Sequence, residues 1–198
     1  MLHTGSMSER EVVLVDMDGV LADFDGATNR HLESLGINVR PRDSFYYRAD
    51  YTDPREVEII NELHASQGFF RNLKPIDGAI GGWNKIEALG YEPRICSSPL
   101  RTNEWCNDEK LEWIERYLGS RAVDLAVIDS RKELYEGVAL IDDRPTISGA
   151  DTASWKHVVF DARYNQVSSS SSHRLRGWND PEFESILDSC GSTTSQNI

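Results

Sequence analysis

Two aspartates with one residue between them follow a short apolar segment near the start of the chain. The segment VVLV at positions 12–15 leads directly into Asp16 and Asp18. A short run rich in β-branched residues predicts a buried strand, and in open α/β sheets ligands bind beyond the carboxyl ends of the strands. Side chains i and i+2 at such an end project into the same crevice. The pair therefore indicates phosphoryl transfer through an aspartyl-phosphate.

Two other interpretations of this motif are possible. An EF-hand calcium loop needs an oxygen ligand at position 20 and a carboxylate at position 27, but the chain has Val20 and Ala27 there. The preceding segment also has the pattern of a strand and not of a helix. The second interpretation, a plain turn with solvated aspartates, stays open on the motif alone, because short motifs often match by chance.

Polar residues also follow two later apolar runs. The run that ends at Cys96 leads into Ser97 and Ser98, whose hydroxyl and backbone N–H groups could hold phosphate oxygens, although Ser-Ser-Pro is usually only a turn. Lys132 follows the apolar run 125–128 and is a compact positive charge that could neutralise a phosphate. These residues would complement the aspartates if the fold brought them to the same edge.

A pair of adjacent acids ends the apolar run 138–141. Asp142 and Asp143 would repel each other unless a cation or a lysine lay between them. Because hard oxygen ligands suit Mg²⁺, two acids at a strand end predict a magnesium site.

Apolar runs alternate with helical patterns along the chain, which favours a parallel sheet with helices on both faces. The expected strands cover residues 12–15, 94–96, 125–128, 138–141 and 158–160. The expected helices cover residues 80–89, 109–118 and 181–187, and the second of these carries Leu111, Ile114, Tyr117 and Leu118 on one apolar face.

The connection between the first two strands, about seventy-five residues, is too long for an ordinary loop. We expect residues 25–74 to form a helical cap over the site, with helices at 27–35 and 54–67. The core domain would then comprise residues 7–24 and 75–190. In the cap, the aromatic residues 45–47 could form the cap's own core or a wall on which a base stacks, and packing is the commoner role.

Together these motifs resemble those of the haloacid dehalogenase (HAD) superfamily and, within it, of the 5′(3′)-deoxyribonucleotidases. The resemblance extends over roughly residues 11 to 188. It is carried by VDMDGVLADF at 15–24, FF at 69–70, LKP at 73–75, GA at 78–79, ICSSP at 95–99, Cys106, EK at 109–110, Trp113, LIDDRP at 140–145, SWKHV at 154–158, Asn165 and Trp178.

The chain departs from the family pattern at two positions. Ser97 stands where the family often has threonine, a change that keeps the hydroxyl. Arg131 stands where the family commonly has an aspartate before the lysine, which bears on the orientation of Lys132.

The resemblance implies an α/β, Rossmann-like parallel sheet with helices on both faces and a small helical cap inserted after the first strand. It implies a Mg²⁺-dependent phosphatase that acts on nucleoside monophosphates, preferentially deoxyribonucleotides. Asp16 would be the nucleophile and Asp18 the acid and base. The metal would be held by Asp16, the backbone carbonyl of Asp18, and Asp142 or Asp143.

The same resemblance implies how the substrate is held. Ser97, Ser98 and Lys132 would bind the phosphate. Similar enzymes sandwich the nucleobase between cap aromatics and the residue at the position of Phe24. The residues expected to surround the base are Phe24, Phe45 or Tyr46, and Phe70. Arg101 and Arg144 would lie where the substrate enters the site.

Two rival functions make different demands on these residues. A HAD phosphatase acting on a sugar phosphate would share the catalytic residues but would not need an aromatic wall. A non-enzymatic binding protein on the same scaffold would be expected to lack at least one of Asp16, Asp18, Lys132 or the acidic pair, and all of these are present.

Composition restricts the possible partners. With 198 residues, 39% of them hydrophobic, the chain can bury one full core. The formal charge of −12 argues against a binding surface for a nucleic-acid polymer or an anionic membrane. No stretch approaches the roughly 18 apolar residues of a membrane span. The three cysteines lack metal-type spacing and predict reduced thiols in a cytoplasmic protein.

Three segments are set apart from the fold. Residues 1–6 could be a vector-derived remnant, the serine run 168–172 is typical of a surface loop, and residues 191–198 are expected to be a disordered tail. Because similar enzymes are often dimers, a homodimer is a further expectation. The preferred base and the choice between 5′ and 3′ phosphates stay open.

Overall fold

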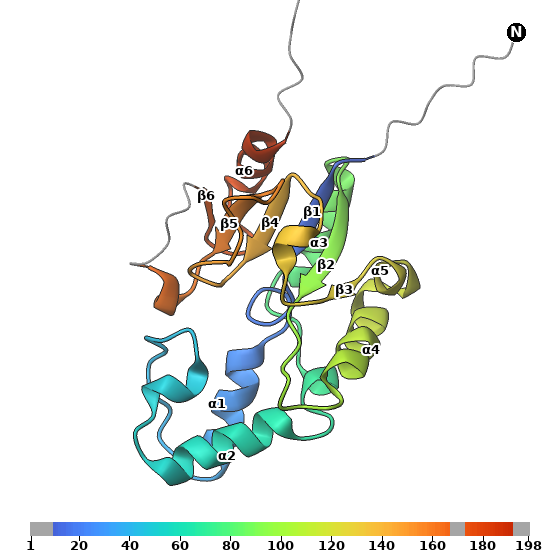
Figure 1. The fold of residues 1–198 in the computed structure, drawn as a ribbon. Helices are drawn as coiled ribbons and strands as arrows, with labels where there is room; N and C mark the ends of the chain where they lie inside the picture. Colours follow the sequence, from blue (N-terminus) through green and yellow to red (C-terminus); the bar gives the residue numbers. More distant parts are fainter. Residues whose placement is uncertain (1–9, 167–172, 192–198) are drawn as a thin grey trace, which may run out of the picture.

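The computed structural model describes residues 10–166 and 173–191 of the chain, so the segments 1–6 and 168–172 and the tail beyond Gly191 lie outside the described residues. Six parallel strands form one sheet in the order β3-β2-β1-β4-β5-β6 (Figure 1). They are β1 Val12–Val15, β2 Glu92–Ser97, β3 Val127–Ile128, β4 Ala139–Asp142, β5 Lys156–Phe160 and β6 His173–Leu175. The α/β parallel sheet predicted from the sequence is thus confirmed.

The helices follow the predicted alternation. They are α1 Phe24–Ser34, α2 Pro54–Ala65, α3 Ala79–Ala88, α4 Cys106–Leu118, α5 Ser120–Asp124 and α6 Phe183–Cys190. Four 3₁₀ turns are η1 Tyr47–Asp50, η2 Phe70–Asn72, η3 Lys132–Leu134 and η4 Arg163–Asn165. Within the described ranges, every helix is too short or too polar to cross a membrane.

Several element boundaries differ from the expected ones. Helix α1 begins three residues early because the Asp23 side chain accepts a hydrogen bond from the backbone N–H of Gly26 (2.9 Å) and so caps the first turn. Strand β3 is only two residues long, since Leu125 is the C-cap of α5 and still has a helical backbone conformation. Strand β6 was not predicted, because three residues with one buried side chain are too few to show a pattern.

The two faces of β1 pack against different partners. Val13 and Val15 belong to the main core, which also includes buried side chains of α3, α4 and α6. Leu14 points to the other face, where it packs with Ile147 and Trp155 from the connection between β4 and β5. Because a strand buried on both faces needs apolar residues at every position, the continuous VVLV run is explained.

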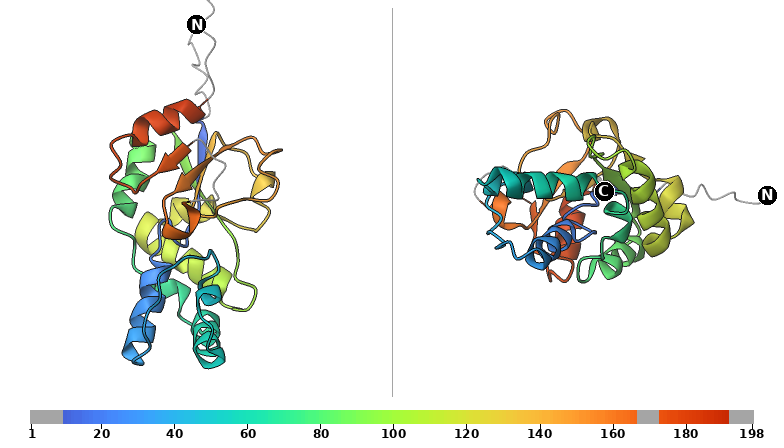
Figure 2. Two further views of the ribbon diagram at one scale, coloured as in Figure 1. Left: turned by 90° about the vertical axis from the view of Figure 1, so that its left-hand side faces the viewer. Right: turned by 90° about the horizontal axis from the view of Figure 1, so that it is seen from below.

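The cap has a small hydrophobic core of its own. Helices α1 and α2 with turn η1 lie beyond the carboxyl ends of the strands (Figures 1 and 2). Leu32, Tyr47, Tyr51 and Ile60 are buried together there. Of the aromatic residues 45–47, Tyr47 therefore belongs to the core of the cap.

A buried carboxylate stabilises the segment in which the chain returns from the cap to the core. Glu109 of α4 accepts hydrogen bonds from the backbone N–H groups of Gly68 and Phe70 and forms an ion pair with Arg71 (3.1 Å). Next to it, the indole N–H of Trp113 donates to the Leu73 carbonyl (2.9 Å). These bonds fix turn η2, and with it the wall that Phe70 gives to the site.

Replacing Glu109 with alanine should therefore lower the free energy of unfolding by about 3 kcal/mol, because two backbone N–H groups, that of Phe70 buried, lose their acceptor and Arg71 loses its buried partner. Urea denaturation would measure the change. The matched control is Glu112→Ala, since Glu112 also pairs with Arg71 but its side chain is 47% exposed against 1% for Glu109. The control should cost less than about 1 kcal/mol. Equal losses in both variants would contradict this role for Glu109.

Candidate functional site

Three neighbouring strands end at the same place with the polar residues singled out in the sequence. Asp16 follows β1, Ser97 ends β2, and Asp142 ends β4. Because β1 lies between β2 and β4, these ends are adjacent, and the backbone N–H of Asp16 donates to the Ile141 carbonyl (2.9 Å). The strand order changes direction at β1, which is where ligands bind in open α/β sheets.

Three carboxylates form a cluster at this edge. Asp16, Asp142 and Asp143 offer oxygens that all lie within 4.8 Å of one another. The buried ammonium of Lys132 lies 2.5 Å from Asp142 Oδ2 and 3.0 Å from Asp16 Oδ1. Lys132 therefore lies next to the carboxylates, where its charge offsets theirs.

The titration behaviour of the cluster reflects an excess of negative charge. Burial raises the pKa of Asp16, but the charges of Lys132 and Lys110 outweigh it, so the pKa is lowered and the group is ionised. Burial and the charges of Asp142 and Asp16 raise the pKa of Asp143 well above its usual range. The lysines thus leave part of the negative charge uncompensated, and a cation would compensate it.

The two adjacent acids differ in their free oxygens. Both oxygens of Asp142 have partners, Lys132 at Oδ2 and the backbone N–H of Arg144 (2.8 Å) at Oδ1. Asp143 Oδ2 accepts a hydrogen bond from the Tyr164 hydroxyl, whereas Oδ1 accepts none from the described residues. Asp143 is therefore the better placed of the two to bind a metal ion directly.

The first pair of aspartates also has spare oxygens. Asp16 Oδ1 and Asp18 Oδ1 are buried and accept no well-aligned hydrogen bond from the described residues, although Lys132 lies close to the first of them. Buried polar atoms are normally satisfied. A set of unsatisfied carboxylate oxygens fits a hard divalent cation such as Mg²⁺.

Lys110 holds the second aspartate, a role that the sequence reasoning missed. Its ammonium is fully buried and lies 2.8 Å from Asp18 Oδ2, 2.9 Å from Ser97 Oγ and 2.8 Å from the Ser98 carbonyl. The available signal was its position, because Lys110 lies four residues after Cys106 and three before Trp113, both buried. Of the face predicted from Leu111, Ile114, Tyr117 and Leu118, only Ile114 is fully buried, whereas the face that carries Cys106, Glu109, Lys110 and Trp113 is buried throughout.

The pKa of Asp18 is shifted in the opposite direction to that of Asp16. Burial raises its pKa, the charge of Lys110 partly opposes this, and the charge of Asp16 raises it further, so the net shift is upward. One aspartate favours the ionised form and its neighbour the protonated form. Two carboxyl groups whose pKa values are pushed apart are typical of a nucleophile and an acid.

A tight turn at Gly19 shapes the floor of the site. Gly19 has φ 76°, in the left-handed region, and its N–H donates to the Ala22 carbonyl (2.9 Å). A Cβ at this position would collide with Asp143 Oδ2. Glycine is therefore required for both its conformation and its size. Met17, between the two aspartates, is fully buried, as alternation predicts.

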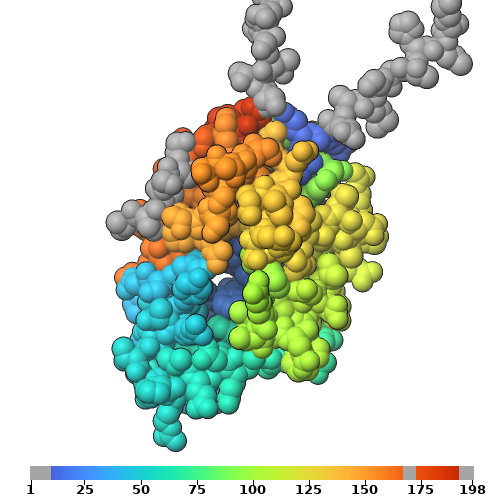
Figure 3. Space-filling view, in the orientation of Figure 1, coloured from blue at the N-terminus to red at the C-terminus, as the bar shows by residue number. Residues whose placement is uncertain are grey.

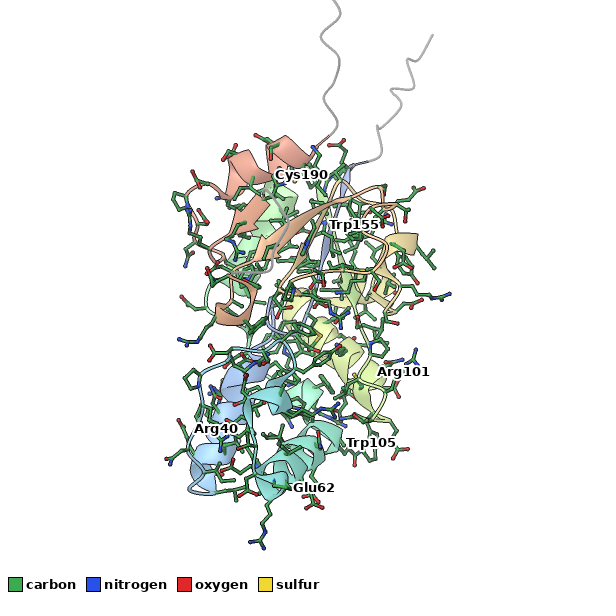
Figure 4. The ribbon with its side chains drawn as sticks, turned by 60° about the vertical axis from the view of Figure 1, so that its left-hand side comes forward. Arg40, Glu62, Arg101, Trp105, Trp155 and Cys190 are labelled. Atoms are coloured by element: carbon green, nitrogen blue, oxygen red, sulfur yellow. The ribbon has the colours of Figure 1, made fainter. Side chains whose placement is uncertain are left out.

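The position of Lys132 does not depend on an aspartate at position 131. Arg131 forms an ion pair with Asp129 (2.8 Å) on the exposed side of the turn. The carbonyl of Lys132 accepts a hydrogen bond from the indole of Trp155 (3.2 Å), which lies beside the sheet (Figure 4). Trp155 thus helps to hold the lysine under the acids.

A cavity of about 950 Å³ lies between the cap and the core, above the acid cluster, and opens as a hollow in the surface (Figure 3). Most of the site residues predicted from the sequence line it. They are Asp16, Asp18, Phe24, Phe45, Tyr46, Phe70, Ser97, Ser98, Arg101, Asp142, Asp143 and Arg144. Lys132 does not line the cavity, because it lies among the carboxylates.

Aromatic rings stand on the cavity walls. The rings of Phe24 and Phe70 are 6.3 Å apart. The guanidinium of Arg144 lies 4.8 Å from the ring centre of Phe45. Tyr46 is 63% exposed and lies against Phe45, with ring centres 5.3 Å apart. Arg101 is exposed on the loop after β2, at the outer edge of the molecule (Figure 4).

Other residues line the cavity without having been predicted, among them Arg42, His64 and Tyr164. The His64 ring lies 4.6 Å from that of Phe24, and burial lowers its pKa to about 4, so it is neutral at pH 7. Isolated residues of these types carry no sequence signal, because only the tertiary fold brings them to the cavity.

The chain matches a family model described as 5′ nucleotidase, deoxy (pyrimidine), cytosolic type C protein over residues 10–187. The human mitochondrial 5′(3′)-deoxyribonucleotidase is 36% identical over 188 residues, which cover 89% of this chain and 82% of that protein. The human cytosolic type is 35% identical over 188 residues, covering 89% and 93%. A Bordetella bronchiseptica protein with a provisional 5′(3′)-deoxyribonucleotidase name is 41% identical over 160 residues, covering 78% and 86%.

Solved structures share the fold at low identity. A Bacillus subtilis protein, YfnB, provisionally described as a HAD-hydrolase and solved bound to magnesium, has a TM-score of 0.54 at 12% identity, with coverage of 91% of this chain and 99% of that one. The haloacid dehalogenase-like hydrolase SP0104 of Streptococcus pneumoniae has a TM-score of 0.52 at 11% identity, covering 87% and 96%.

The charge balance of the cluster can be tested through stability. In Lys132→Met, Asp16 and Asp142 lose their buried counter-charge, and the free energy of unfolding at pH 7 should fall by at least about 3 kcal/mol. The folded variant would then bind protons more readily than the unfolded chain. Its deficit relative to the wild type should therefore shrink as the pH falls from 7 to 5.

Urea denaturation of both proteins at the two pH values measures this difference. Lys85→Met, a lysine that lies over the Phe183 ring away from the acids, is the control and should show no such pH dependence. A deficit in Lys132→Met that is the same at both pH values would refute the proposed balance.

Proposed function

The chain belongs to the family of 5′(3′)-deoxyribonucleotidases, phosphoric monoester hydrolases of the HAD superfamily, and we propose that it hydrolyses deoxyribonucleoside monophosphates with Mg²⁺ through an aspartyl-phosphate. One observation carries this proposal. An ionised aspartate and an aspartate with a raised pKa, the latter held by a buried lysine, lie at the floor of a cavity with aromatic walls.

Asp16 is the nucleophile in this mechanism. Its lowered pKa keeps the carboxylate ionised, and one of its oxygens attacks the phosphorus in line with the sugar oxygen. As the bond from phosphorus to the sugar oxygen breaks, Asp18 gives that oxygen its proton. The hydroxyl of Ser97 and the N–H of Ser98, at the carboxyl end of β2, would hold phosphoryl oxygens.

Asp18 then acts as the base. Having lost its proton, it takes one from a water molecule, whose oxygen attacks the phosphorus of the aspartyl-phosphate. The acyl phosphate bond breaks, inorganic phosphate is released and Asp16 is restored. Lys110 lies 2.8 Å from Asp18 Oδ2 and keeps the side chain directed at the reacting group in both steps.

The residues that would hold Mg²⁺ are Asp16, the backbone carbonyl of Asp18 and Asp143, with Asp142 holding Lys132 in place. The ion would supply positive charge that offsets the phosphate dianion and the carboxylates and polarises a phosphoryl oxygen. The spare carboxylate oxygens at this edge support this assignment.

The cavity walls support a nucleotide substrate. Phe24 and Phe45 line the cavity and are rings on which a base could stack, with the buried Phe70 packed next to Phe24 and the Arg144 guanidinium over Phe45. An apolar wall would leave a ribose 2′-hydroxyl without a hydrogen-bond partner, which disfavours ribonucleotides. Arg101 would contact the substrate at the opening of the cavity.

Two further expectations concern the whole protein. The described cysteines form no disulfide with one another, which supports a cytoplasmic location. Homodimer formation stays a prediction that rests on the resemblance.

A panel of substrates tests the assignment. Deoxyribonucleoside monophosphates, in particular those of uracil and thymine, should give higher kcat/KM than the matching ribonucleotides and than phosphorylated sugars without a base. Excess EDTA should abolish turnover, and added Mg²⁺ should restore it. A sugar phosphate with the highest kcat/KM would refute the nucleotidase assignment, and full activity in EDTA with no metal bound would refute the magnesium mechanism.

Substitution of each aspartate separates their roles. Asp16→Asn lacks the nucleophile, so no phosphoenzyme should form. Asp18→Asn keeps the nucleophile but loses proton transfer in both steps, each worth roughly 10²- to 10⁴-fold in rate. With an acyl phosphate, whose leaving group needs no proton, Asp18→Asn should be phosphorylated and keep the label longer than the wild type. Acid-quenched mass spectrometry locates the label, and a label on Ser97 would overturn the assignment.

A further inference from the structure

We infer that Tyr164 is a positioning residue that orients Asp143 for the cation and links this orientation to the seating of the cap. The inference rests on the metal site of the proposed function. Tyr164 lies in turn η4 of the core, lines the cavity, and donates a hydrogen bond from its hydroxyl to Asp143 Oδ2. Groups that hydrogen-bond a metal ligand fix its orientation and tune its affinity for the metal.

The turn that carries Tyr164 is fixed to the main chain of Asp143. The fully buried side-chain amide of Asn165 donates to the carbonyls of Asp143 and Phe160, both at 2.8 Å. Its oxygen accepts the backbone N–H of Ala162 (3.0 Å). Asp143 is therefore held at its backbone by Asn165 and at its side chain by Tyr164, two consecutive residues of one turn.

The carboxylate of Asp143 has little room for another orientation. Oδ2 also lies close to Gly19, where a Cβ would collide with it and would lie 3.4 Å from the Tyr164 hydroxyl. With Oδ2 confined in this way, Asp143 still offers an oxygen within 4.8 Å of those of Asp16 and Asp142. The hydrogen bond from Tyr164 thus selects a rotamer in which the cluster can share one ion.

The ring of Tyr164 is also a platform for the cap. The guanidinium of Arg42 lies 4.6 Å from the centre of this ring, and the Phe45 ring meets it edge-on at 5.8 Å. Arg42 is itself fixed, because it pairs with Asp25 and donates to the Phe45 carbonyl (2.7 Å). The cap segment 42–45 and Tyr164 therefore form one packed unit.

These contacts give Tyr164 two separable functions. Its hydroxyl acts on the metal site through Asp143, and its ring supports the cap wall that Phe45 presents to the substrate. A cap seated on the ring holds the hydroxyl in place, so the cavity wall and the acid cluster are aligned together. The exposed ion pair between Arg163 and Asp43 (2.7 Å) also joins core and cap, but exposed pairs stabilise little.

Tyr164→Phe tests the hydroxyl, since it keeps the ring and its contacts with Arg42 and Phe45. Isothermal titration of the metal-free full-length protein with Mg²⁺ alone should give a Kd about tenfold higher than that of the wild type. The matched control is Tyr135→Phe, which removes another hydrogen bond from tyrosine to aspartate, Tyr135 to Asp129 (3.1 Å), away from the cluster. Its Mg²⁺ affinity should equal that of the wild type.

Tyr164→Leu tests the ring. At saturating Mg²⁺, Tyr164→Phe should keep the wild-type KM for a deoxyribonucleotide, whereas Tyr164→Leu should raise KM several-fold, because the cap loses its platform. A double-mutant cycle with Asp143→Asn provides an internal check, since removing the hydroxyl should no longer change the Mg²⁺ affinity in that background. Thermal unfolding confirms that each variant is folded.

The outcomes separate this inference from the proposed function. If the wild type binds no Mg²⁺, the metal site of the proposed function fails. If the wild type binds Mg²⁺ and Tyr164→Phe binds it equally well, only the role of Tyr164 is refuted. An unchanged KM in Tyr164→Leu would refute the link to the cap.

Discussion

The structure depends on the balance of buried charge where β1, β2 and β4 end. Asp16, Asp18, Asp142 and Asp143 lie together at this edge, and among the described residues Lys110 and Lys132 are the buried cations that neutralise them. Burying an unpaired charge costs several kcal/mol, so each lysine must be held close to its acids. The excess of acid over base leaves a site whose natural complement is a cation.

The surrounding elements hold these charged residues in position. The sheet order puts β1 between β2 and β4, so that three loops share one crevice. Helix α4 delivers Lys110 to Asp18 from one side, while turn η3, held by Trp155, delivers Lys132 to Asp16 from the other. Each lysine lowers the pKa of the aspartate that it pairs with. At Asp16 the charges of the two lysines outweigh burial, whereas at Asp18 burial and the charge of Asp16 outweigh Lys110, so the two acids have opposite pKa shifts and distinct chemical roles.

The cap adds selectivity to a core that could carry out phosphoryl transfer on many substrates. Glu109 holds the segment in which the chain returns from the cap to the core, because its carboxylate accepts hydrogen bonds from the backbone of Gly68 and Phe70. The cap residues Arg42 and Phe45 are held by contacts with the ring of Tyr164. Since the walls of the cavity come from both parts, the position of the cap decides what fits above the acids.

The sequence by itself determined the strands that precede the acids, the parallel α/β class and the polar residues at the strand ends that line the cavity, because apolar runs ending in polar residues are local signals. It did not reveal Lys110, Tyr164 or strand β6. Lys110 has the charge of a surface residue and is buried because α4 brings it to Asp18 and to Ser97 at the end of β2. Nor could it choose between Asp142 and Asp143, since that choice depends on which oxygens Lys132, Arg144 and Tyr164 occupy in space. Contacts between distant segments are set by packing, and only the tertiary structure specifies them.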